Sequence, residues 1–260
     1  MNLIQVESRA HAEATYAALR RLPLVGDAAD ISREDPPGVR ARADRLPAHL
    51  AALLDAYTRV PGQTWIHGVA LWVDDGDCLM AWLEDPGLRP AALRTAASCA
   101  LAGALLHVLR TDFQTALRGD AEPLPDHAAQ VAARLGPLRA ALWEGRAAPP
   151  LAIWHCPSLG TRGRATSGSF GRRVALDLGQ PPLDAVFLAL HEETHAVSDA
   201  LAVPDPATRR RRDTRRGEPG HETHAVLEAA AVAVAAAVVE ARAPELVDAY
   251  REWERRWLGI

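Results

Sequence analysis

Apolar residues recur at helical spacing through most of the first half of the chain. The segment LPAHLAALLDAYTRV at 46–60 follows this spacing and is closed by Pro-Gly, so the pattern predicts a helix there. Two more helices are predicted at about 88–118 and 126–146, with the turn-rich GDAEPLPD between them. At 65–85, two Trp-containing apolar runs flank the sequence DDGD. This arrangement predicts a hairpin with an Asp-Gly turn, with a broken helix as the alternative.

The composition changes at 147–150, where Ala-Ala-Pro-Pro marks a boundary between two halves. Beyond this boundary the pattern predicts strands at 151–160 and 172–179 and helices at 182–202, 221–242 and 244–258. We therefore predict an α+β chain that is predominantly helical. A helical N-terminal region covers 1–148, and a second domain with a small sheet covers 149–260.

The bulk composition favours a soluble globular protein. Hydrophobic residues make up 48% and charged residues 24% of the 260 positions, and a formal net charge of −4 gives no general attraction to nucleic acid or an anionic membrane. The three cysteines are widely separated, which indicates reduced thiols rather than a disulfide framework. The most apolar stretch, 225–239, is shorter than a bilayer span and is interpreted as a buried helix. We predict a cytoplasmic protein with no membrane segment.

The sequence HEETH at 191–195 follows the apolar run AVFLAL and points to metal chemistry. On a helix, His191 and His195 lie on one face about 5–6 Å apart at Cβ, so their imidazoles can converge on one zinc ion. Glu192 lies about 100° further round the helix, beside the metal, where it can accept a proton from water. Glu193 is expected to point away as a surface residue. Burial of two histidines and a glutamate is costly without a partner, and a metal removes that cost.

The C-terminal part, about 151–257, resembles the gluzincin type of zincin metallopeptidase, because His191, Glu192 and His195 match its HExxH motif. The metzincin pattern is excluded, since Leu201 stands where its third histidine would fall. The resemblance implies one zinc per chain, Glu192 as catalytic base, a peptide or protein substrate, and a third ligand that is a glutamate on a later helix. It also implies an edge strand that binds substrate, for which Val174, Ala175 and Leu176 are the candidates.

The candidates for the third ligand are His221, Glu222, His224 and Glu228. Glu228 is favoured because it is followed by small residues, as in gluzincins, and Glu222 is the second choice. On a helix His221, His224 and Glu228 share one face, so His224 could hydrogen-bond the ligand or a developing oxyanion as a second catalytic residue. Asp199, one turn after His195, is interpreted as an exposed residue, with a hydrogen bond to that ligand as the alternative.

The predicted function is that of a zinc-dependent metallopeptidase. The alternative is a catalytically inactive, zincin-like binding or regulatory protein, in which His224 joins the other ligands and closes a structural zinc site. A di-metal oxidase would need a second helical ExxH, and the only other instance, 218–221, crosses a Pro-Gly turn. The arginine run at 209–216 is interpreted as a solvated loop, so nucleic acid is an unlikely partner. Cleavage specificity and oligomeric state stay open.

Overall fold

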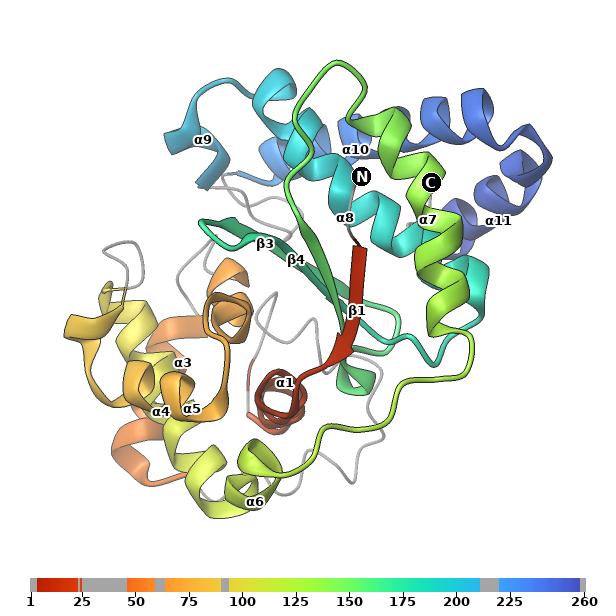
Figure 1. The fold of residues 1–260 in the computed structure, drawn as a ribbon. Coiled ribbons are helices and arrows are strands. Elements are labelled where there is room, and N and C mark those ends of the chain that lie inside the picture. The colour runs from red at the N-terminus through yellow and green to blue at the C-terminus, as the bar shows by residue number, and fades with distance from the viewer. Residues whose placement is uncertain are drawn as a thin grey trace. The chain divides into compact units, whose positions relative to one another are not determined.

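The computed structural model describes residues 4–22, 24, 46–58, 64–89, 94–210 and 220–257. The chain divides into two compact units (Figure 1). The first contains the described residues of Met1–Ser8, Pro123–Arg210 and Glu222–Ile260, and the second those of Arg9–Glu122 and Arg211–His221. This division differs from the single boundary predicted near residue 148. The N-terminal strand pairs with a strand of the C-terminal part, and for this reason it belongs to the same unit.

All described elements of the second unit are helical. They are α1 (Ala10–Arg21), α3 (Ala48–Thr58), the 3-10 helix η3 (Thr64–Trp72), α4 (Gly76–Glu84), the 3-10 turn η4 (Pro86–Leu88), α5 (Ala96–Asp112) and α6 (Gln114–Arg118). The helix predicted at 88–118 is therefore divided, because the chain leaves the helical conformation at Phe113.

The hairpin predicted at 65–85 is wrong, and the broken helix is what forms. Asp75, within the DDGD sequence, caps α4: its carboxylate accepts a hydrogen bond of 2.7 Å from the backbone N–H of Cys78. A carboxylate at this position satisfies one of the open N–H groups at a helix start. The same residues that suggest an Asp-Gly turn thus begin a helix.

The first unit is built on a four-stranded mixed sheet of order β1-β2-β4-β3 (Figure 1). Its strands are β1 (Ile4–Ser8), β2 (Leu151–His155), β3 (Gly163–Gly168) and β4 (Gly171–Leu176). β1 and β4 both run parallel to β2, and β3 runs antiparallel to β4. The predicted α+β class, predominantly helical with a small sheet, is confirmed. Two of the four strands, β1 and β3, were not predicted.

Helices pack on this sheet and on one another. They are α7 (Ala128–Leu142), α8 (Pro182–Ala202), α9 (Pro206–Arg210), α10 (His221–Arg242) and α11 (Val247–Trp257), with the 3-10 turns η6 (Pro157–Leu159) and η7 (Pro244–Leu246). α8 packs on β3 and β4, while α7 packs on both α8 and β1 (Figure 1). The bounds of α8 and α10 agree with the predicted helices, since proline punctuation and helical periodicity coincide there.

Helix α10 is apolar, but it is not buried on all sides. Leu227, Ala231, Ala235 and Val239 form a fully buried stripe at a spacing of four residues. Among the residues that the structure describes, α10 is the one helix that by length and composition alone could cross a membrane; only 28% of its most apolar window is buried. Core helices also pass this test, so the finding is weak evidence for a membrane span. The predicted buried helix is therefore buried along this stripe, with Val234, Ala236 and Val238 partly buried against the core, and it is exposed at Ala225 and Val226.

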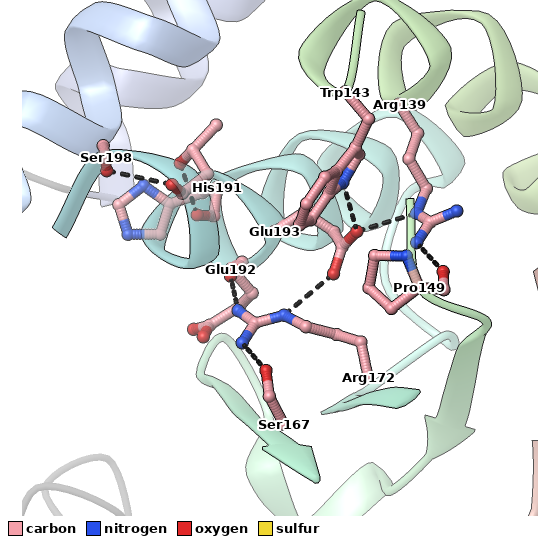
Figure 2. A network of polar contacts seen from close by, with 10 residues as sticks. Arg139, Trp143, Pro149, Ser167, Arg172, His191, Glu192, Glu193 and Ser198 are labelled. Atoms are coloured by element: carbon pink, nitrogen blue, oxygen red, sulfur yellow. Dashed lines mark hydrogen bonds and ion pairs between the residues drawn. The ribbon is translucent and has the colours of Figure 1, made fainter. Parts of the chain in front are cut away.

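A buried ionic group joins α8 to its neighbours (Figure 2). The Glu193 carboxylate accepts hydrogen bonds from Arg139 Nε of α7 at 2.7 Å and from Arg172 Nε of β4 at 2.9 Å. The side chains of Glu193 and Arg139 are both 0% exposed. Trp143, directly after α7, adds an indole N–H at 3.4 Å. The expectation that Glu193 is a surface residue is wrong, because α7 covers the face of α8 that carries it.

Replacing Glu193 with alanine is expected to destabilise the protein strongly. It would leave two guanidinium groups in the core without their carboxylate, and breaking such a pair costs about 3–5 kcal/mol. Urea unfolding measures this difference in the free energy of unfolding. Glu240→Ala is the control, because Glu240 pairs with Arg251 at the surface, where both side chains are more than half exposed. An equal loss of unfolding free energy in the two variants would contradict the importance assigned to the buried group.

Candidate metal centre

Three side chains from two helices converge on one point. His191 and His195 come from α8 and Glu228 comes from α10. The two Nε2 atoms are 3.3 Å apart, and they lie 3.2 Å and 3.5 Å from the two carboxylate oxygens of Glu228. Among the described residues this is the one group of three or more His, Cys, Asp or Glu whose ligand atoms could hold a metal ion.

The donor types of this group suit a zinc ion. Two imidazoles and one carboxylate are among the preferred zinc donors. With zinc–nitrogen bonds of about 2.0–2.1 Å, neighbouring ligand atoms of a tetrahedron lie about 3.3–3.4 Å apart, and the two Nε2 atoms are 3.3 Å apart. The distances of 3.2 Å and 3.5 Å reach different oxygens of Glu228; with one ligand atom taken from each residue, the three atoms all lie within 4.8 Å of one another. The donor set therefore fits zinc in its chemistry, and its members lie close enough together to share one ion.

The other nitrogen of His195 is held by Asp199. His195 Nδ1 lies 2.8 Å from Asp199 Oδ1, and the Asp199 side chain is 20% exposed. A carboxylate at Nδ1 favours the tautomer that carries its proton there, so the Nε2 lone pair is available to a metal. The interpretation of Asp199 as an exposed residue is thus wrong, and the alternative hydrogen bond is present. His191 Nδ1, by contrast, is buried with no hydrogen-bond partner within the described part of the chain.

The electrostatics of the cluster also suit a cation. Burial alone would raise the pKa of Glu228, but the hydrogen bond from His191 and the charges of His195, His191 and His224 lower it to about 2. Burial opposes a charge on His191, yet the hydrogen bond and charge of Glu228, with smaller contributions from Glu192 and Asp199, raise its pKa above the usual value. In the metal-free chain, an ionised Glu228 therefore faces a His191 that holds a proton more tightly than usual.

Glu192 lies beside this group and not within it. Its side chain is packed against the backbone of β3: a Cβ added at Gly163 would come within 2.5 Å of Glu192 Oε1 and 2.7 Å of its Cγ. Only glycine leaves room for this side chain at this point of the strand. Glu192 is partly exposed. It is thus a carboxylate next to the first ligand, with access to solvent.

The other candidates from the helix α10 lie outside the ligand group. His224 Nδ1 is 3.6 Å from Glu228 Oε1, one turn earlier on the helix, and its side chain is 23% exposed. Glu222, the second choice for third ligand, is exposed. His221 is partly buried and also not among the three converging residues. The structure thus brings Glu228, not Glu222, to the two histidines.

The predicted substrate strand is wrong. Val174, Ala175 and Leu176 are each 0% exposed and belong to β4, which is hydrogen-bonded to β2 on one side and to β3 on the other. The strands at the two ends of the sheet are β1 and β3, and it is β3 that Glu192 contacts. Sequence reasoning missed it because GRATSG has the composition of a turn and lacks apolar alternation. The repeated glycines before the HEETH helix were the available signal for a close backbone approach.

Most of the arginine run at 209–216 lies outside the described residues. Arg209 belongs to α9, and its guanidinium donates a hydrogen bond of 2.9 Å to the carbonyl of Pro204. This contact ties Arg209 to the backbone just beyond α8. It gives no indication of a nucleic-acid site.

Comparison of the chain with protein-family models, with curated proteins and with solved structures finds no match.

Zinc affinity is expected to depend on Asp199 through His195. Asp199→Asn keeps the size of the side chain but replaces the acceptor that orients the imidazole, and such changes weaken metal binding about 10–100-fold. Competition with a chromogenic chelator measures the affinity. Glu228→Gln should weaken binding further, since it replaces a charged ligand. His49→Ala, at an exposed position of α3, is the control and should bind zinc like the wild type. Unchanged affinity in both Asp199→Asn and Glu228→Gln would exclude this site.

Zinc uptake near pH 7 is expected to release a proton from His191. A metal ligand must be the neutral imidazole, whereas the raised pKa of His191 favours its protonated form in the metal-free chain. Affinity should therefore fall as the pH drops through that raised pKa. Calorimetry in buffers of different ionisation enthalpy counts the protons. Glu228→Gln should release fewer protons per zinc, because it removes the charge that raises the pKa; an equal count would contradict this account.

Proposed function

We propose that the protein is a zinc-dependent hydrolase that cleaves peptide or other amide bonds. The observation that supports this proposal is the juxtaposition of three convergent zinc-type ligands, His191, His195 and Glu228, with Glu192, a carboxylate next to the first of them but outside the group. This division of roles is what water-dependent zinc catalysis requires. A structural zinc site would not need the additional carboxylate.

The number of converging ligands favours catalysis. Structural zinc sites have four protein ligands, whereas catalytic sites have three and leave one position to water or substrate. His191, His195 and Glu228 are three, and His224 is not part of the group. The 3.6 Å contact between His224 and Glu228 is the one observation on the side of the structural alternative, in which His224 would complete the set.

The residues of the site divide the chemistry between them. Zinc held by His191, His195 and Glu228 would act as a Lewis acid that acidifies water and polarises a carbonyl. Glu192 accepts the proton of the attacking water and returns it to the leaving amine. Asp199 keeps His195 in the required tautomer. His224 supports the Glu228 carboxylate or donates to the developing oxyanion.

The strand β3 is the element of the sheet that suits an extended substrate. It is the last strand, it runs antiparallel to β4, and the Glu192 side chain lies on its backbone. A peptide that adds to a sheet edge pairs through main-chain hydrogen bonds, which places its carbonyls in register with the strand. We therefore assign substrate binding to β3 in place of Val174, Ala175 and Leu176. The features that the protein would share with gluzincins are an end strand, a zinc-binding helix and a glutamate on a later helix.

Glu192→Gln is expected to keep about one zinc per chain and to lower the turnover of a peptide substrate about 10²–10⁴-fold, because it removes the general base without touching a ligand. A library of internally quenched peptides and metal analysis of the same preparations measure both quantities. Glu222→Gln makes the same chemical change at an exposed position of α10 and should retain zinc and turnover. Zinc binding with no hydrolysis by the wild type would favour the structural alternative, and absence of zinc would exclude both.

A further inference from the structure

Arg172 joins three elements of the site at one guanidinium group (Figure 2). The side chain comes from β4 and is 7% exposed. Its Nε donates to Glu193 Oε1 of α8 at 2.9 Å, and its Nη1 donates to Ser167 Oγ of β3 at 2.9 Å. Its Nη2 donates to the backbone carbonyl of Glu192. One rigid, planar donor group therefore holds β3 and the backbone of Glu192 in a fixed relation.

The contact between Glu192 and β3 depends on that relation. Gly163 lies under the Glu192 side chain with no room for a Cβ, and Ser167, four residues along the same strand, is held by Arg172. The strand is thus attached to the HEETH helix at two points. A small shift of β3 would either press on the Glu192 carboxylate or release it.

Arg139 alone would neutralise the Glu193 carboxylate, so charge neutralisation does not explain why a second arginine, Arg172, is buried beside it. Arg139 already supplies one positive charge at 2.7 Å and already links α7 to α8, and its Nη2 donates to the Pro149 carbonyl. Burying another guanidinium costs desolvation energy. Arg172 differs from Arg139 in what its remaining donors reach: the Glu192 backbone and the end strand. Figure 2 shows the Arg172 guanidinium between Ser167 and these two glutamates.

We propose that Arg172 is a positioning residue that acts through Glu192, with Glu193 as the group that orients it. Arg172 sets the distance between the end strand β3 and the HEETH helix, so that the Glu192 carboxylate stays over Gly163. This role rests on the proposed function, since the positioned group is the proposed base. The structural part of the proposal is that Arg172 holds β3 against α8. This part does not depend on turnover and can be measured without an activity assay.

The experiment compares Arg172→Lys with Arg139→Lys in the zinc-loaded protein. Both changes keep a positive charge beside Glu193 and remove the forked donor geometry, but only the first affects β3 and the Glu192 carbonyl. Hydrogen exchange followed by mass spectrometry reports on the backbone of 163–168 and, as an internal reference, of 151–155. Loss of a charged hydrogen bond is expected to speed exchange in 163–168 about tenfold in Arg172→Lys, with 151–155 unchanged. Arg139→Lys should leave 163–168 at the wild-type rate.

Steady-state kinetics with the internally quenched peptide that the wild type cleaves fastest gives the second readout. Arg172→Lys is expected to lower kcat about 10–100-fold, with KM changed less than about twofold, because misplacement of a catalytic group affects the chemical step. Gly163→Ala should act in the same direction with zinc retained, because its Cβ displaces Glu192 while the arginines stay in place. It also serves as the test if Arg172→Lys does not fold.

The outcomes separate this proposal from the proposed function. Faster hydrogen exchange of 163–168 in both arginine variants, or in neither, would overturn the proposal that Arg172 holds β3 against α8. Equal losses of kcat in Arg172→Lys and Arg139→Lys, or an unchanged kcat in Gly163→Ala, would overturn the positioning role. If the wild type binds zinc and cleaves no peptide, the proposed function fails, and the exchange comparison still decides whether Arg172 clamps β3 to α8.

Discussion

The pairing of Glu193 with Arg139 and Arg172 is the interaction on which the arrangement of this unit depends. A carboxylate on α8 that is 0% exposed is tolerable only because two guanidinium groups surround it. Those two arginines come from α7 and β4, so the same contacts attach α8 to a helix on one side and to the sheet on the other. The position of the HEETH helix therefore depends on Glu193, which is not one of the three converging residues.

The opposite face of α8 also carries largely buried polar side chains that need a partner of opposite charge. His191 and His195 are turned towards Glu228 of α10, and the charges of the group shift the pKa of Glu228 down and that of His191 up. Without a cation, the ionised Glu228 carboxylate is stabilised by a proton on His191. A divalent cation would replace that proton with a stronger partner for all three groups.

The proposal of a catalytic centre rather than a structural one rests on the residues near His191, His195 and Glu228. Glu192 is separated from the ligand set but pressed onto the end strand β3, and His224 is within reach of Glu228 but not of a common metal position. Within the described part of the chain, Glu192 is outside the group of three and its side chain has no arginine partner, so these contacts give it no structural role. The proton transfer proposed beside a zinc ion would give it one.

Local patterns in the sequence predict the two helices that carry the candidate site and the face that its histidines share. Periodicity and proline punctuation predict α8 and α10, and a spacing of four residues places His191 and His195 on one face whatever the helix packs against. The choice of Glu228 over Glu222 also agrees with the structure, because helical phase decides which of the two faces the histidines. Strand order, the burial of Glu193 and the role of Arg172 were decided by tertiary structure alone. These features depend on residues far apart in the chain, such as Arg139 with Glu193 and β1 with β2, and a local pattern carries no information on which distant segment will neutralise a charge or pair with a strand.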